Sequence, residues 1–148
     1  MQMQQSELVF GFVYGIGTDA SPVVSLLIDY LKQFGYNNHE FRVSDHLRAL
    51  DLGISYNPFK AFAGMNALMD AGNTARKRAA ADDILAVMAV NEIASRRTEE
   101  KPLWGVAHLI RSLKTPDEVR LLRDVYRPGF FLIGIASDED EHLTTLLT

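Results

Sequence analysis

The 148-residue sequence contains no cysteine, which excludes disulfide bridges, cysteine-ligated zinc or iron–sulfur centres and a cysteine nucleophile. It also lacks an apolar run of the ~18 residues that span a bilayer, since stretches such as 84–90 and 130–136 are far shorter. No Lys or Arg precedes Lys32, so the basic start of a secretory signal is missing. We therefore expect a cytoplasmic protein with no membrane partner.

Positive charge is scarce as well. The chain has 15 Lys and Arg against 19 Asp and Glu, a net charge of −4, which disfavours duplex DNA as a partner. Hydrophobic residues make up 47% of the sequence, and a chain of this length buries roughly 68–70% of its unfolded surface. These values predict a single globular domain over residues 1–148.

The first part of the chain alternates between strand and helix patterns. Residues 8–13 form a short apolar run typical of a strand that is buried on both faces. A glycine loop follows, and Ser21 and Pro22 are expected to be the N-cap and first residue of a helix that ends near Gly35. Phe41 and Val43 alternate with polar residues, which predicts a brief second strand.

The rest of the chain continues this alternation. Residues 57–97 are rich in Ala, Met and Leu and predict helices, and residues 103–110 predict a third strand. Thr115, Pro116 and Glu118 form a capping-box pattern at the start of another helix, and residues 130–136 predict a fourth buried strand. We expect an α/β fold with three α/β/α layers and a mostly parallel sheet, because parallel neighbours need crossover connections.

The glycine loop fits two nucleotide-binding patterns incompletely. If Tyr14 starts the phosphate-loop pattern G-x-x-x-x-G-K-[ST], Asp19 replaces the second glycine, Ala20 replaces the lysine and Ser21 supplies the hydroxyl. Lys60 and Lys114 are candidates to replace the missing lysine. The same loop, from Gly15 and Gly17 through Thr18 to Ala20, also matches G-x-G-x-x-[GA], with Glu40 as the ribose-binding acid. A plain turn into the helix is the alternative.

Further candidate site residues lie beyond the ends of the other predicted strands. Ligands of parallel sheets bind at the carboxyl ends of strands, where we expect Asp45, Arg111 and Ser137. Arg111 suits paired hydrogen bonds to phosphate, although a surface role is equally consistent with its position. Arg76 is a second phosphate candidate whose alternative is a solvated helix face. The four histidines lack metal-ligand spacing, and we expect no metal site but a core position for His108 and for Trp104.

Two segments resemble the N-terminal P-loop domain of bacterial anti-phage dCTP deaminases. The first consists of the Gly15–Asp19 loop, Ser44-Asp45, residues 69–73 and Arg76, in this order along the chain. The second consists of residues 110–119 followed by residues 130–134. These stretches are also similar to dephospho-CoA kinase and nucleoside monophosphate kinases. In the deaminases this kinase-like domain precedes a zinc deaminase domain, so the resemblance implies a domain excised from a longer antiviral protein.

The resemblance implies a regulatory, nucleotide-binding role. Gly15, Gly17 and Thr18 would offer backbone donors, Ser21 a metal-side hydroxyl and Asp45 a metal or sugar contact, with magnesium arriving with an NTP or dNTP. Zinc would belong to the absent deaminase domain, since this chain has no H-x-E and no P-C-x-x-C pattern and is not expected to deaminate alone. That domain and a homo-oligomer are the protein partners considered.

Two alternatives remain open at this point. The first is an active nucleoside monophosphate or dephospho-CoA-type kinase in which another lysine replaces the missing one. The second is an interaction domain that binds no nucleotide and dimerises through its Ala- and Met-rich middle segment.

Overall fold

A computed structural model describes residues 6–42 and 83–138 of the chain. The strands are β1 (Leu8–Tyr14), β2 (Asn37–Arg42), β3 (Val106–Arg111) and β4 (Phe130–Ile135). The α-helices are α1 (Ser21–Gln33), α4 (Ile84–Arg96) and α5 (Pro116–Tyr126), and a single 3-10 turn, η1 (Arg127–Gly129), leads into β4. The four strands form one sheet in the order β2-β3-β1-β4, and every neighbouring pair is parallel.

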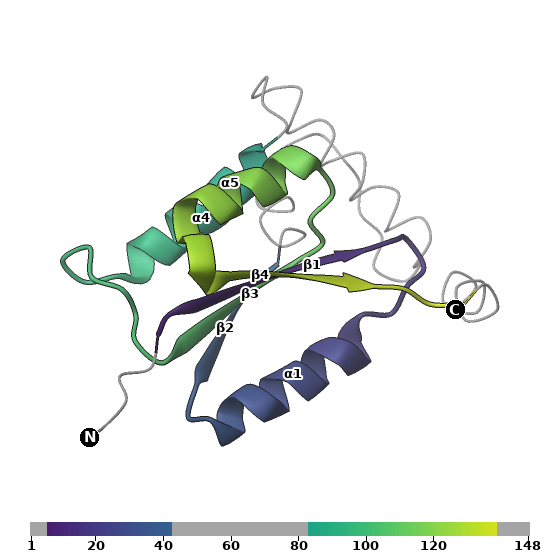
Figure 1. Cartoon of the computed structure of the whole chain (residues 1–148), viewed down its shortest axis with the longest axis horizontal. Coiled ribbons are helices and arrows are strands. Elements are labelled where there is room, and N and C mark those ends of the chain that lie inside the picture. The colour runs from purple at the N-terminus through teal and green to yellow at the C-terminus, as the bar shows by residue number, and fades with distance from the viewer. Residues whose placement is uncertain (1–5, 43–82, 139–148) are drawn as a thin grey trace, which may run out of the picture.

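The helices cover the two faces of the sheet, which confirms the expected three-layer α/β/α fold (Figure 1). On one face, Val24 and Leu31 of α1 pack with Phe12 and Leu109 of the sheet. On the other face, α4 and α5 lie side by side, and their residues Ile93 and Leu122 share a core with the sheet. Neighbouring side chains of the central strands β1 and β3 therefore enter separate cores, as strand geometry requires.

The start of α5 was the clearest local prediction, and the structure confirms it. Thr115 is the N-cap, and its side chain accepts a hydrogen bond from the backbone N–H of Glu118. The carboxylate of Glu118 reaches back to the N–H groups of Lys114 at 2.7 Å and Thr115 at 3.2 Å. Glu118 is fully buried, so the capping box also fixes the chain between β3 and α5.

Several boundaries differ from expectation. β2 begins at Asn37, before its apolar residues, because it is an edge strand of the described sheet and an edge strand tolerates polar side chains. β3 begins at Val106 rather than 103, and the indole of Trp104 lies in the preceding turn with 54% of its surface exposed, so the expectation of a core tryptophan was wrong. β4 is the other edge strand of the described sheet, and Phe131 remains 45% exposed.

Candidate functional site

The carboxyl ends of β1 and β3 form the place where connections diverge. These two strands are neighbours in the sheet. The chain leaves β1 toward α1 on one face, whereas it leaves β3 toward α5 on the opposite face (Figure 1). In open parallel sheets, such a divergence leaves a crevice in which ligands commonly bind. The two loops that follow β1 and β3 therefore carry the candidate site.

The glycine loop after β1 begins with a tight turn. The N–H of Thr18 donates to the carbonyl of Gly15 at 3.2 Å, and Gly17 has a φ of 83°. That backbone conformation favours glycine at the third position of the turn, so local geometry alone explains Gly17. Gly15 is different, because its φ is not positive and an added Cβ would meet nothing within 4 Å. The turn does not require a glycine there, and the space above Gly15 is open to a ligand.

The loop then enters α1 in a way that differs from the expected cap. Ala20 is the N-cap, and Ser21 is the first residue of the helix. The expectation that Ser21 is the N-cap was therefore wrong; the carboxylate of Asp19, one residue before the N-cap, accepts a hydrogen bond from the N–H of Ser21 at 3.0 Å. An anion at a helix start is stabilised by the helix dipole, but it also repels a phosphate at the same point. The hydroxyls of Thr18 and Ser137 lie 3.2 Å apart and join the loops after β1 and β4.

Lys114 brings a positive charge to the loop that lacks its own lysine. Its ammonium group donates to the carbonyl of Tyr14, the last residue of β1, at 3.1 Å and lies 5.6 Å from the centre of the Tyr14 ring. Two hydrogen bonds fix the backbone at this point. The N–H of Leu113 donates to the carbonyl of Phe12 at 2.9 Å, and the N–H of Lys114 donates to the carboxylate of Glu118 at 2.7 Å. Lys114 was one of two named substitutes for the missing lysine, and the other, Lys60, lies outside the described residues.

The path from Arg111 to Lys114 includes a strained residue. Ser112 has a φ of 68°, which is unfavourable for a residue with a Cβ and costs roughly 1–2 kcal/mol. This conformation turns the chain sharply at the end of β3, directly beside the glycine loop. Strain of this kind persists where the surrounding contacts enforce it, and it is concentrated at functional sites.

Arg111 forms part of a small charged cluster at the ends of β2 and β3. Its guanidinium lies 3.0 Å from the Glu40 carboxylate, whose second oxygen lies 3.3 Å from Arg42. Arg111 is largely buried, with 18% of its side chain exposed, whereas Arg42 is half exposed at 49%. Both guanidinium groups therefore lie beside the carboxylate of Glu40. Glu40, the acid that the dinucleotide pattern predicts for a ribose, pairs with both arginines.

The other predicted site residues lie outside the described part of the chain. Asp45 and Arg76 fall in this category. Of the described candidates, Gly15, Gly17, Thr18, Asp19 and Ser21 lie in the loop after β1 or at the start of α1, and Arg111 is the last residue of the neighbouring strand β3. Within residues 6–42 and 83–138, no group of three or more His, Asp or Glu side chains has the arrangement of a metal site.

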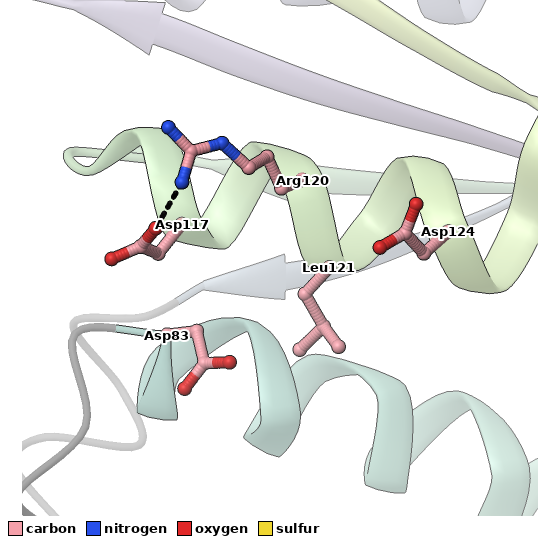
Figure 2. Close-up of a pocket in the computed structure, with 5 residues that line it drawn as sticks. All are labelled: Asp83, Asp117, Arg120, Leu121 and Asp124. Atoms are coloured by element: carbon pink, nitrogen blue, oxygen red, sulfur yellow. Dashed lines mark hydrogen bonds and ion pairs between the residues drawn. The ribbon is translucent and has the colours of Figure 1, made fainter.

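A hollow lies between α5 and the start of α4. It has a volume of about 280 Å³ and is lined by Asp83, Asp117, Arg120, Leu121 and Asp124. Figure 2 shows the Asp117 carboxylate beside Arg120, an ion pair of 2.7 Å, while Asp83 projects from the start of the neighbouring helix. Three carboxylates against one guanidinium make this hollow unsuitable for a phosphate.

Comparison with known proteins adds no assignment, since neither a protein-family model nor a curated protein sequence matches the chain. The helices in the described ranges are too short or too polar to cross a membrane.

Proposed function

We propose that this chain binds the phosphate groups of a nucleotide at the carboxyl edge of its sheet, between the loops that follow β1 and β3. The observation that carries this proposal is the position of Lys114. The loop after β1 has the glycines of a phosphate-binding loop but no lysine, and the ammonium group of Lys114 lies at the start of that loop. A lysine acts on phosphate as a point charge, so its position in space matters more than its place in the sequence.

Three further features support a phosphate ligand. The space above Gly15 is open, which lets a ligand approach the backbone closely. The start of α1 places the positive end of its helix dipole at the same edge, while the N–H of Ser21 is bound by Asp19 and Pro22 has no N–H. Arg111 and Arg42 both lie beside Glu40, and a phosphate that replaced Glu40 would accept paired hydrogen bonds from Arg111.

Asp19 is the feature that opposes an anion, and magnesium would resolve the conflict. Carboxylate and hydroxyl oxygens are the ligands that Mg²⁺ prefers, and Mg²⁺ commonly uses only one or two protein carboxylates beside water and phosphate. Asp19 and Ser21, at the start of α1, offer this chemistry. When bound, the ion would neutralise phosphate charge.

The resemblance to the P-loop domain of anti-phage dCTP deaminases extends the proposal to a role. In this hypothesis the chain is a regulatory domain in the cytoplasm that reports the level of an NTP or dNTP to a zinc deaminase domain. Deamination itself would reside in that other domain, because this chain contains no cysteine for the zinc site.

The position of Lys114 also favours a second candidate, a nucleotide kinase in which Lys114 replaces the loop lysine. Phosphoryl transfer depends on charge neutralisation and positioning, which a lysine from a neighbouring loop can provide. Sustained ADP production from ATP and a nucleoside monophosphate, abolished in a Lys114→Ala variant, would favour the kinase. Binding without turnover would favour the regulatory domain.

Thermal unfolding with a panel of NTPs, dNTPs, dCMP, CoA and NAD, each with and without magnesium, tests the proposal. A ligand that binds only the folded protein stabilises it by about 2.7 kcal/mol at a hundredfold excess over its Kd. We expect a stabilising ligand among the nucleotides, and we expect Arg111→Ala to weaken its binding by ~1–3 kcal/mol. Arg120→Ala is the matched control, because Arg120 is an exposed arginine of α5. Absence of any shift across the panel would reject nucleotide binding.

A further inference from the structure

The strand β4 has the sequence of an interior strand but lies at an edge of the described sheet. Its six residues, Phe130–Ile135, are all apolar or glycine. One edge of β4 pairs with β1, and no described strand pairs with its other edge. Strands that are apolar on both faces are typical of the interior of a parallel sheet, where neighbours protect both edges. The outer edge of β4 is therefore a candidate surface for another strand.

The opposite edge of the same sheet shows what a protected edge looks like. β2 is largely polar, and its charged residues Glu40 and Arg42 lie 3.3 Å apart. Charged side chains, proline and bulges are the features by which edge strands avoid pairing with further chains. β4 contains no charged residue and no proline, and its register with β1 continues without a bulge from Phe130 to Ile135. The composition and geometry of β4 therefore do not oppose the addition of a further strand.

Side chains on both faces of β4 continue the apolar surface up to its outer edge. Phe131 lies on the face that α1 covers, where its ring stacks on that of Phe10 with 5.4 Å between the ring centres, and 45% of Phe131 is exposed. Leu132 projects from the opposite face, because successive side chains alternate, and 40% of it is exposed. An added Cβ at Gly134 would meet nothing within 4 Å, so the edge also has room for a neighbour there. A partner strand that fits this edge must be apolar on both of its faces.

We propose that β4 of one molecule pairs in the antiparallel direction with β4 of a second copy and joins the two sheets into one. β4 itself meets the requirement that the partner strand be apolar on both faces. A two-fold axis perpendicular to the sheet uses the same surface on both copies, so the interface is self-complementary. This axis makes the two β4 strands run in opposite directions, and each apolar face of one sheet continues as the same face of the other. Backbone hydrogen bonds between the strands and contacts of Phe131 and Leu132 with the second copy hold the dimer together.

Charges at the two ends of β4 favour the antiparallel direction. Arg127 lies three residues before the strand and Asp138 lies three residues after it, and both residues are exposed. Antiparallel pairing brings the positive end of each β4 beside the negative end of the other, at both ends of the interface. Parallel pairing would place like charges together, which is unfavourable. β4 carries no charge between these ends, so the net charge of −4 on each copy does not oppose the contact locally.

The size of the edge sets the expected strength of the dimer. Six residues of a strand extend over roughly 20 Å. Stable complexes bury roughly 800 Å² on each partner, and one short strand with its exposed side chains supplies only part of this area. We therefore expect a reversible dimer that forms at micromolar concentrations and dissociates on dilution. The interface lies on the outer edge of β4, whereas the proposed phosphate site lies between the loops after β1 and β3, so the dimer does not depend on the proposed function.

Sedimentation velocity of the full chain over a range of micromolar concentrations tests the proposal. We expect the mass to rise from that of one chain to that of two as the concentration increases. Leu132→Lys places a charge on the edge and should weaken dimerisation at least tenfold. Leu26→Lys is the matched control, because Leu26 is 58% exposed and its helix α1 packs against β2 at the opposite edge of the sheet. A wild-type monomer at every concentration, or equal dimerisation of the two variants, would overturn the proposal.

Cross-linking provides a second test that does not depend on how Leu132→Lys folds. The sequence contains no cysteine, so a single introduced thiol reports on one position. A two-fold axis at β4 places the two copies of residue 132 close together, so a short bifunctional maleimide should link the Leu132→Cys variant into dimers. The Leu26→Cys variant has its thiol at a more exposed position and should remain unlinked under the same conditions. Equal linking of both variants, or linking of neither, would contradict pairing through β4.

Discussion

Replacement of Glu118 is the perturbation whose size follows most directly from the structure. The carboxylate accepts two hydrogen bonds, from the N–H groups of Lys114 at 2.7 Å and Thr115 at 3.2 Å, and the residue is fully buried. Hydrogen bonds to a charged group each contribute about 1.5–3 kcal/mol. Two such bonds give an upper range of about 3–6 kcal/mol, and partial rehydration of the two donors reduces it. We expect Glu118→Ala to lower the free energy of unfolding by about 3 kcal/mol.

Glu118→Gln separates the charge from the shape. The amide oxygen still accepts from both N–H groups, but charge-assisted bonds are roughly twice as strong as neutral ones. We therefore expect a loss of about 1.5 kcal/mol, half that of the alanine variant. Urea unfolding followed by circular dichroism measures both values, and an unchanged slope of free energy against urea would show that the unfolded state is the same. A loss below about 0.5 kcal/mol for Glu118→Ala would refute the reasoning.

Three further predictions concern stability. Gly17→Ala should lower the free energy of unfolding by about 1 kcal/mol, because Gly17 has a positive φ. Gly15→Ala should change the free energy of unfolding in urea by less than about 0.5 kcal/mol but weaken nucleotide binding. Equal losses of stability in the two variants would contradict the different roles of these glycines. Gly11→Ala should cost about 1–3 kcal/mol in the same assay, because the new Cβ would lie 2.6 Å from Leu113; a neutral result would show that this core is loosely packed. Burial raises the pKa of Tyr126 to about 12, so this tyrosine should ionise near pH 12 in an ultraviolet titration, whereas the unfolded group ionises near pH 10. The wild-type protein should therefore lose stability between pH 10 and 12, and Tyr126→Phe should lose less. Ionisation of every tyrosine near pH 10 would contradict the burial of Tyr126.

Local sequence signals predicted most of the fold. The apolar runs at β1 and β4 and the capping box at Thr115 depend on neighbours within a few residues, so the sequence alone identifies them. β2 was placed too late in the chain because Asn37 and Asn38 do not look like strand residues, and only pairing with β3 makes them so. Trp104 is the opposite case. It is a large apolar residue next to a strand and was expected in the core, but it lies in an exposed turn.

The site was harder to predict because its contacts span the chain. Lys114 and Tyr14 are 100 positions apart, and no sequence spacing reveals that their loops meet. The parallel order of β1 and β3 creates that meeting, and the order of strands is a property of the whole sheet. The same holds for His39 and His108, which lack the spacing of a metal site but become neighbours on adjacent strands.

The central claim is that Lys114 supplies the charge that the glycine loop lacks. Isothermal titration of the best nucleotide from the thermal panel against Lys114→Ala tests it most directly. Lys101→Ala is the matched control, because Lys101 is an exposed lysine before β3, with 72% of its side chain accessible. The account predicts at least a tenfold loss of affinity for Lys114→Ala and none for Lys101→Ala. Equal affinity of the two variants would contradict it.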